Sequence, residues 1–124
     1  MKKMLMSIYK KLHAHYGPQY WWPARTPFEM IAGAILTQNT AWSNVEKAIV
    51  NLKTAKLLSS PSKMEGCHIK RLSGLIKPAG FYNLKAGRLK NFLSFLSSKF
   101  DSSLYKLARL RTGRLRKELL GVSG

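Results

Sequence analysis

Residues 36–42 of this 124-residue chain read Leu-Thr-Gln-Asn-Thr-Ala-Trp and separate two segments in which apolar residues have helical spacing. Apolar residues recur every three or four positions from Phe28 to Leu36 and again from Val45 to Leu52. The stretch therefore predicts a tight corner between two helices. Corners usually contain Gly, Pro or charged residues, whereas this one holds amides, hydroxyls and an indole that are candidates for binding a ligand.

The charge balance points to a polyanionic partner. Lys and Arg number 22 against 5 acidic residues, for a net charge of +17, while 45% hydrophobic residues are enough for a folded core. DNA, RNA and an anionic membrane surface all fit such a chain. Cys67 is the single cysteine, so an internal disulfide is excluded. The longest apolar run, residues 30–36, is too short to cross a membrane, and we expect a cytoplasmic protein.

The rest of the chain also shows helical periods and no alternation of period two, which predicts an all-α fold. Thr26 and Pro27 are typical of a helix start, with Glu29 placed to complete a capping box. We expect Thr40 or Ser43 to cap the helix after the corner, as a short polar side chain does at an N-cap. The remaining expected helices are residues 2–16, part of 54–66, 69–76, 82–99, a short segment from Asp101 or Ser102 to Leu110, and 112–120.

Few residues suit catalysis. Glu46 and Glu118 are expected in mid-helix, where a solvated or ion-paired role is the default. His13 and His15 have no metal-ligand spacing, and the adjacent Cys67 and His68 would diverge on a helix. We therefore predict no catalytic residue and no metal ligand in this chain.

Signals for nucleic-acid binding are stronger. Aromatic side chains can stack on an unpaired base, and an amide such as Gln38 can fill the gap left in a duplex. Basic side chains near the start of the last helix suit a phosphate. The candidates are the aromatic Trp21, Trp22 and Trp42 for a base pocket, and Gln38, Lys85, Arg88, Lys90, Arg114 and Arg116 for DNA.

Four segments together resemble one protein family. They are Tyr-Trp-Trp-Pro at 20–23, Gly-Ala-Ile-Leu-Thr-Gln-Asn-Thr at 33–40, Ile-Lys-Pro-Ala-Gly-Phe-Tyr-Asn-Leu-Lys-Ala at 76–86 and Leu-Leu-Gly-Val-Ser-Gly at 119–124. In this order they are similar to the endonuclease III superfamily of helix-hairpin-helix DNA glycosylases. The nearest branch includes the bacterial 3-methyladenine DNA glycosylases.

The resemblance implies a helical-bundle lobe of a bilobal all-α enzyme that hydrolyses the N-glycosidic bond of a damaged, alkylated base. It implies that Gln38 enters the duplex, with Asn39 and Thr40 beside it in the DNA-binding corner. Trp42 and one Trp of the Trp21-Trp22 pair would stack on the extruded base. The expected partner is double-stranded DNA with a damaged base, in a bacterial or archaeal nucleoid, with no membrane and with a monomeric full-length protein.

The chain departs from the family at its last residue. Gly124 falls at the first glycine of the expected hairpin, so residues 1–124 are expected to form a single partial glycosylase domain that is incomplete at the C-terminus. The catalytic Asp, the Lys of the lyase reaction and the four cysteines of a 4Fe-4S cluster would all lie beyond it. We therefore expect no cofactor in this chain and no base release by the chain alone.

Two alternatives compete with a glycosylase fragment. One is a non-enzymatic basic helical module that binds DNA or RNA through phosphates alone. The other is a membrane-surface or partner-docking helix at residues 82–96. Neither gives Gln38 a role, which favours the glycosylase.

Overall fold

The computed structural model describes all residues, 1–124, and every regular element in it is helical. The prediction of an all-α fold is confirmed. The elements are α1 (Lys2–Tyr16), α2 (Pro27–Leu36), α3 (Trp42–Thr54), α4 (Pro61–Glu65), α5 (Ile69–Leu75), the 3-10 turn η1 (Lys77–Ala79), α6 (Tyr82–Phe100), α7 (Leu104–Ala108) and α8 (Thr112–Leu120). No helix combines the length and the apolar character that crossing a bilayer requires.

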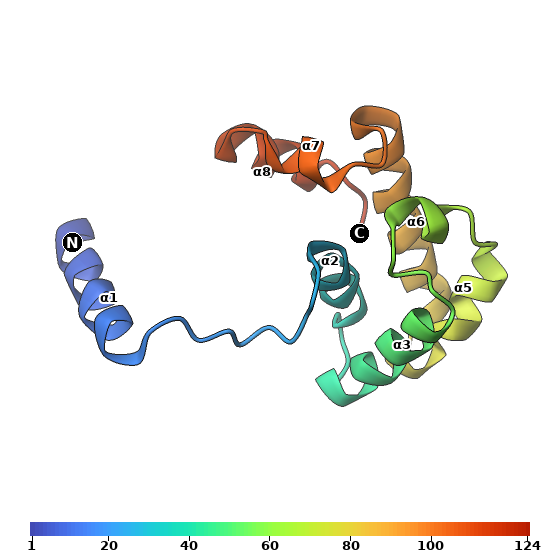
Figure 1. Cartoon of the computed structure of the whole chain (residues 1–124), viewed down its shortest axis with the longest axis horizontal. Coiled ribbons are helices and arrows are strands. Elements are labelled where there is room, and N and C mark those ends of the chain that lie inside the picture. The colour runs from blue at the N-terminus through green and yellow to red at the C-terminus, as the bar shows by residue number, and fades with distance from the viewer.

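The longest helix, α6, is the centre of the body. Helices α2, α4, α5 and α7 all pack against it, and α3 packs on α2, α5 and η1 (Figure 1). Its buried face carries Ala86, Leu89 and Leu93, which belong to a core of 17 residues, whereas Leu84 is 54% exposed. Because this apolar face is already buried inside the protein, residues 82–96 do not present the free apolar face that a membrane-surface or partner-docking helix needs.

A smaller apolar cluster continues along the C-terminal half of α6. Phe92, Leu96 and Phe100 pack with Leu107 of α7, and Leu115 of α8 covers them in part. Helices α7 and α8 therefore attach to the body through this second cluster. An open groove of about 480 Å³ runs between α2 and these two helices.

Helix α1 stands apart from the rest of the molecule. It lies away from the other helices in Figure 1, and its bounds are as predicted. Every residue in it is exposed, including the apolar Leu5, Ile8 and Leu12, which recur at helical spacing. The segment 17–26 connects it to α2 and contains Pro18 and Pro23. The apolar spacing therefore identified the helix correctly, while the packing normally associated with that spacing is not present.

The helix starts follow the predictions in part. The Thr26 hydroxyl accepts a hydrogen bond from the Glu29 backbone N–H at 3.1 Å, and Pro27 occupies the first helical position. The capping box is incomplete, because the Glu29 carboxylate pairs with Lys53 at 2.8 Å. The N-cap of α3 is Ala41, with no side-chain cap, so the prediction of Thr40 or Ser43 is wrong.

One further cap also differs from the prediction. Ser103 caps α7 in place of Asp101 or Ser102, which both lie in the left-handed region, with φ of 52° and 57°.

Candidate nucleic-acid interface

The corner between α2 and α3 is formed by residues 37–41, as the sequence predicts. The Thr37 hydroxyl donates to the Gly33 carbonyl at 2.5 Å and so closes the end of α2. Asn39 has φ of 55°, the left-handed conformation that Asn tolerates better than most residues, and its side chain is exposed. Thr40 accepts a hydrogen bond from the Asn44 amide at 3.1 Å. These local hydrogen bonds hold the backbone of the corner in one conformation.

Gln38 sits at the meeting point of three segments. Its side-chain oxygen accepts a hydrogen bond from Arg88 of α6, and its Nε2 donates to the Gly124 carbonyl at 3.1 Å. The side chain is half-buried. The amide therefore lies at the surface, and its direction is set by Arg88 of α6.

Trp22 and Trp42 pack around Gly33, and Trp21 packs on Trp22. Trp22 and Trp42 pack edge to face with ring centroids 5.5 Å apart, and Trp21 lies 5.2 Å from Trp22. A Cβ at Gly33 would lie 3.4 Å from the Trp42 ring and 3.7 Å from Trp22, so the absence of a side chain there lets the rings approach α2. Trp42 Nε1 donates to the Glu46 carboxylate at 3.0 Å.

The tryptophan cluster leaves π-surface available for a ligand. Trp21 is 76% exposed, and a cavity of about 340 Å³ opens beside Trp22 and Trp42. The indole N–H of Trp22 is buried and has no hydrogen-bond partner. An aromatic base could stack on the exposed ring surface.

Lys85 does not lie where a phosphate ligand must lie. Its side chain is 1% exposed, and its ammonium group donates to the Leu36 carbonyl at 2.8 Å and to the Ala79 carbonyl at 2.7 Å. Burial, with a smaller contribution from the nearby Arg88 charge, lowers the pKa of Lys85 from its ordinary value of 10.5. The prediction that Lys85 contacts DNA is therefore wrong, because its ammonium is enclosed by the fold.

Lys90 is used in the same way. Its ammonium donates to the Met64 carbonyl at 3.1 Å, to the Glu65 carbonyl at 2.5 Å and to the Cys67 carbonyl, at the end of α4. The carbonyls at a helix C-terminus have no partner within the helix, and a cation satisfies both their hydrogen bonds and the helix dipole. Two of the basic residues on α6 therefore serve the fold.

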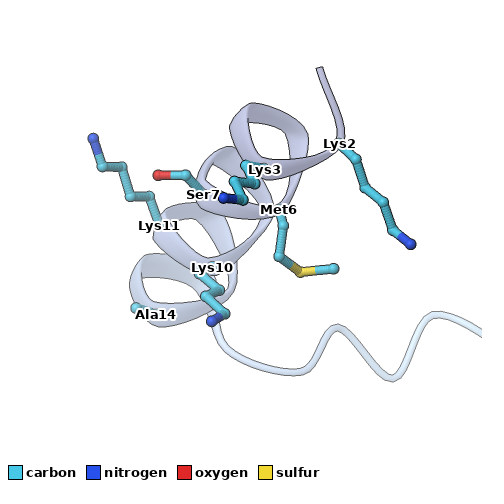
Figure 2. A pocket seen from close by; sticks show the side chains of 7 residues that line it. All are labelled: Lys2, Lys3, Met6, Ser7, Lys10, Lys11 and Ala14. Carbon is cyan, nitrogen blue, oxygen red and sulfur yellow. The ribbon is translucent and has the colours of Figure 1, made fainter.

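The remaining cations stay at the surface. Arg114 and Arg116 on α8 are exposed, as a phosphate contact requires. Helix α1 presents a further basic face, on which Ser7 and Ala14 lie among lysines (Figure 2). The lysines of this face are Lys2, Lys3, Lys10 and Lys11.

Phe81 is an exposed aromatic residue for which the sequence predicted no role. Phe81 lies between η1 and α6, is 65% exposed and has φ of 45°. The left-handed conformation is uncommon for a bulky residue. Its sequence signal is the Pro-Ala-Gly-Phe order at 78–81, in which an aromatic residue directly follows a turn.

Each of the five carboxylates already has a partner. Glu29 pairs with Lys53, Glu46 accepts from Trp42, and Glu65 accepts from Ser97 and Ser102. Hydrogen bonds from Lys106 and Lys99 lower the pKa of Asp101 and of Glu118, respectively, so both stay ionised. No cluster of three or more His, Cys, Asp or Glu side chains is placed to hold a metal ion. A 4Fe-4S cluster needs four thiolates, and this chain has one cysteine, which is buried.

The helical fold, the corner and the aromatic cluster agree with a family assignment from sequence. Residues 32–116 match the model of the HhH-GPD superfamily of base excision DNA repair proteins, and the chain belongs to that superfamily.

Two known proteins resemble the chain over almost its whole length. The "Putative DNA repair glycosylase MJ1434" of Methanocaldococcus jannaschii is 48% identical over 124 residues, which are 98% of this chain and 56% of that protein. The 3-methyladenine DNA glycosylase MagIII of H. pylori, in a crystal structure bound to 1,N6-ethenoadenine, superimposes with a TM-score of 0.71 at 27% identity. That match covers 98% of this chain and 58% of the MagIII chain. The chain thus spans little more than half the length of both relatives.

Proposed function

We propose that these 124 residues form the DNA-recognition part of a base-excision DNA N-glycosylase that acts on alkylated bases. One observation carries the proposal: both parts of a base-extrusion site lie against one helix, α2, or just beyond its end. Gly33 packs against the Trp22–Trp42 pair, and Gln38 follows the end of the same helix. With a rise of about 1.5 Å per residue, these two positions are roughly 8 Å apart along the chain. An extruded base on the tryptophans and an amide in the vacated duplex position fit this separation.

The chemistry suits an aromatic pocket. An alkylated purine offers an aromatic face that stacks on an indole ring, and where alkylation leaves a positive charge on the purine, that charge is also attracted to the indole face. A charged base of this kind is in addition a good leaving group, so hydrolysis of its N-glycosidic bond needs little acid catalysis. In this proposal Trp21, Trp22 and Trp42 bind the base, and Gln38 occupies the gap in the duplex. Phe81, exposed at the neighbouring turn, is a further candidate for a DNA contact.

The catalytic carboxylate is proposed to lie outside these residues. All five carboxylates of the chain are already engaged in hydrogen bonds or ion pairs. Both relatives contain more than 40% of sequence beyond the matched part. We further propose that the complete protein is a monomer that acts on double-stranded DNA in the cytoplasm. The 124 residues on their own are expected to bind damaged DNA and to release no base.

Two measurements test the proposal. The first compares the dissociation constants of the chain for a duplex with one 1,N6-ethenoadenine and for the same duplex with adenine, at one salt concentration. We expect tighter binding to the modified duplex. The second measures base release by the 124 residues alone, for which we expect none above the uncatalysed rate. Equal affinities with a steep salt dependence would instead support a basic module that binds phosphates alone.

A further inference from the structure

The buried ammonium of Lys85 joins two segments that are far apart in the sequence. It donates to the carbonyl of Leu36, the last residue of α2, and to that of Ala79, the last residue of η1. Both carbonyls lie at the ends of helical segments, where the last carbonyls lack a partner within the segment. The Lys85 ammonium satisfies both carbonyls with one group, and its charge also offsets the negative end of the α2 dipole.

Each of these helix ends leads directly into an exposed turn. Leu36 precedes the corner that carries Gln38, and Ala79 precedes Gly80 and the exposed Phe81. Arg88 lies three residues after Lys85 on α6 and donates to the Gln38 side chain. Residues three apart lie on one face of a helix. One face of α6 therefore holds the backbone of the corner through Lys85 and the amide of Gln38 through Arg88.

We propose that Lys85 is a positioning residue for DNA recognition, which fixes the corner at 37–41 relative to the turn at 80–81. This inference rests on the proposed function. Without the ammonium, the Leu36 and Ala79 carbonyls lose their shared donor, and the two turns can move independently. Gln38 would then enter the duplex from a less defined position, and the preference for damaged DNA would fall.

Lys90 provides a matched control on the same helix. Its ammonium also donates to backbone carbonyls, but these lie at Met64, Glu65 and Cys67, away from the corner. Lys85→Met and Lys90→Met thus each remove a carbonyl-bound ammonium from α6. A loss of stability is expected in both variants, whereas a loss of recognition is expected in only one.

The experiment measures the ratio of affinities for the duplex with 1,N6-ethenoadenine and for the unmodified duplex, together with the thermal midpoint of each variant. We expect the ratio to fall about five- to tenfold in Lys85→Met, the equivalent of roughly one lost hydrogen bond of ordinary strength, and to stay unchanged in Lys90→Met. Gln38→Ala should lower the affinity ratio less in the Lys85→Met background than in the wild-type chain. The reason is that both substitutions act through the position of the Gln38 amide.

The outcomes separate this inference from the proposed function. A wild-type ratio near one refutes the proposed function itself. A wild-type preference that survives in folded Lys85→Met, or that falls equally in Lys90→Met, overturns the role of Lys85. If Lys85→Met does not fold, the affinity ratio of Lys85→Arg tests the inference instead. The bulkier guanidinium in a site this buried must displace one of the two turns. A ratio in Lys85→Arg equal to that in Lys90→Arg would then overturn the inference.

Discussion

Truncation of Trp42 is the most direct test of the aromatic pocket. Trp42 is half-buried, packs edge to face with Trp22 at 5.5 Å and lies over Gly33. In the proposed complex, Trp42→Ala removes one stacking surface from the extruded base, which is worth about 1–3 kcal/mol by alanine substitution. It also removes the ring that orients Trp22, an aromatic pair worth about 0.5–1.5 kcal/mol beyond its buried area.

The lost stacking predicts about 1–3 kcal/mol weaker binding of the duplex with 1,N6-ethenoadenine, or a dissociation constant about 5- to 150-fold higher, whereas the lost aromatic pair lowers the stability of the fold. Affinity for the unmodified duplex should change less than about twofold, because Trp42 carries no charge for a phosphate. Fluorescence anisotropy with both duplexes at a fixed salt concentration measures the two values. Circular dichroism and the thermal midpoint show whether the variant is folded.

Trp42→Phe is the matched control. It keeps an aromatic face for the base but loses the hydrogen bond from the indole N–H to Glu46, which is exposed to solvent. We expect a loss of no more than about fivefold, since an exposed hydrogen bond of this kind contributes about 1 kcal/mol or less. A folded Trp42→Ala that keeps its affinity for the modified duplex would refute stacking on Trp42. An equal loss on both duplexes would do the same.

Two further predictions concern charge. Replacing both Arg114 and Arg116 by Gln should make the slope of log affinity against log salt less negative by about 0.9 for each phosphate that is no longer neutralised, and an unchanged slope would exclude both as phosphate ligands. The second follows from the lowered pKa of Lys85. At pH values between the lowered pKa and 10.5, Lys85 is protonated in the unfolded chain and deprotonated in the folded chain. The difference in free energy of unfolding between the wild type and Lys85→Met should therefore rise with pH in this window only. Urea denaturation from about pH 7 to about pH 11 measures the difference, and a flat or falling difference would contradict the burial of a titrating ammonium.

Local rules were sufficient for the helices. The Thr26-Pro27 start, the spacing of apolar residues in α2 and α3 and the corner between them all follow from interactions within a few residues. Such interactions involve residues that are neighbours in the sequence, so the bounds of α1, α2 and α8 could be predicted with little error. The aromatic and amide candidates for DNA binding came from the same stretches, with the family resemblance supplying their roles.

The partners of the charged residues on α6 could not be read in this way. Lys85, Arg88 and Lys90 share one helix and looked alike as phosphate ligands, yet two of them are bound to backbone carbonyls and the third to Gln38. The packing of the core determines which ends of other helices lie against α6. The spacing of residues within α6 does not indicate this. A polar side chain becomes a cap or a surface ligand according to what lies opposite it.

The sequence by itself determined that this protein is all helical, basic and equipped at residues 36–42 with side chains suited to an unpaired base. Only the tertiary structure showed that Gly33 lets two tryptophans meet on α2, and that a buried ammonium joins the corner to the turn before α6. The physical reason is the distance along the sequence over which the interactions act. Helix formation and capping act over a few residues, whereas burial of Lys85 links positions 49 residues apart and exists only once the helices have packed.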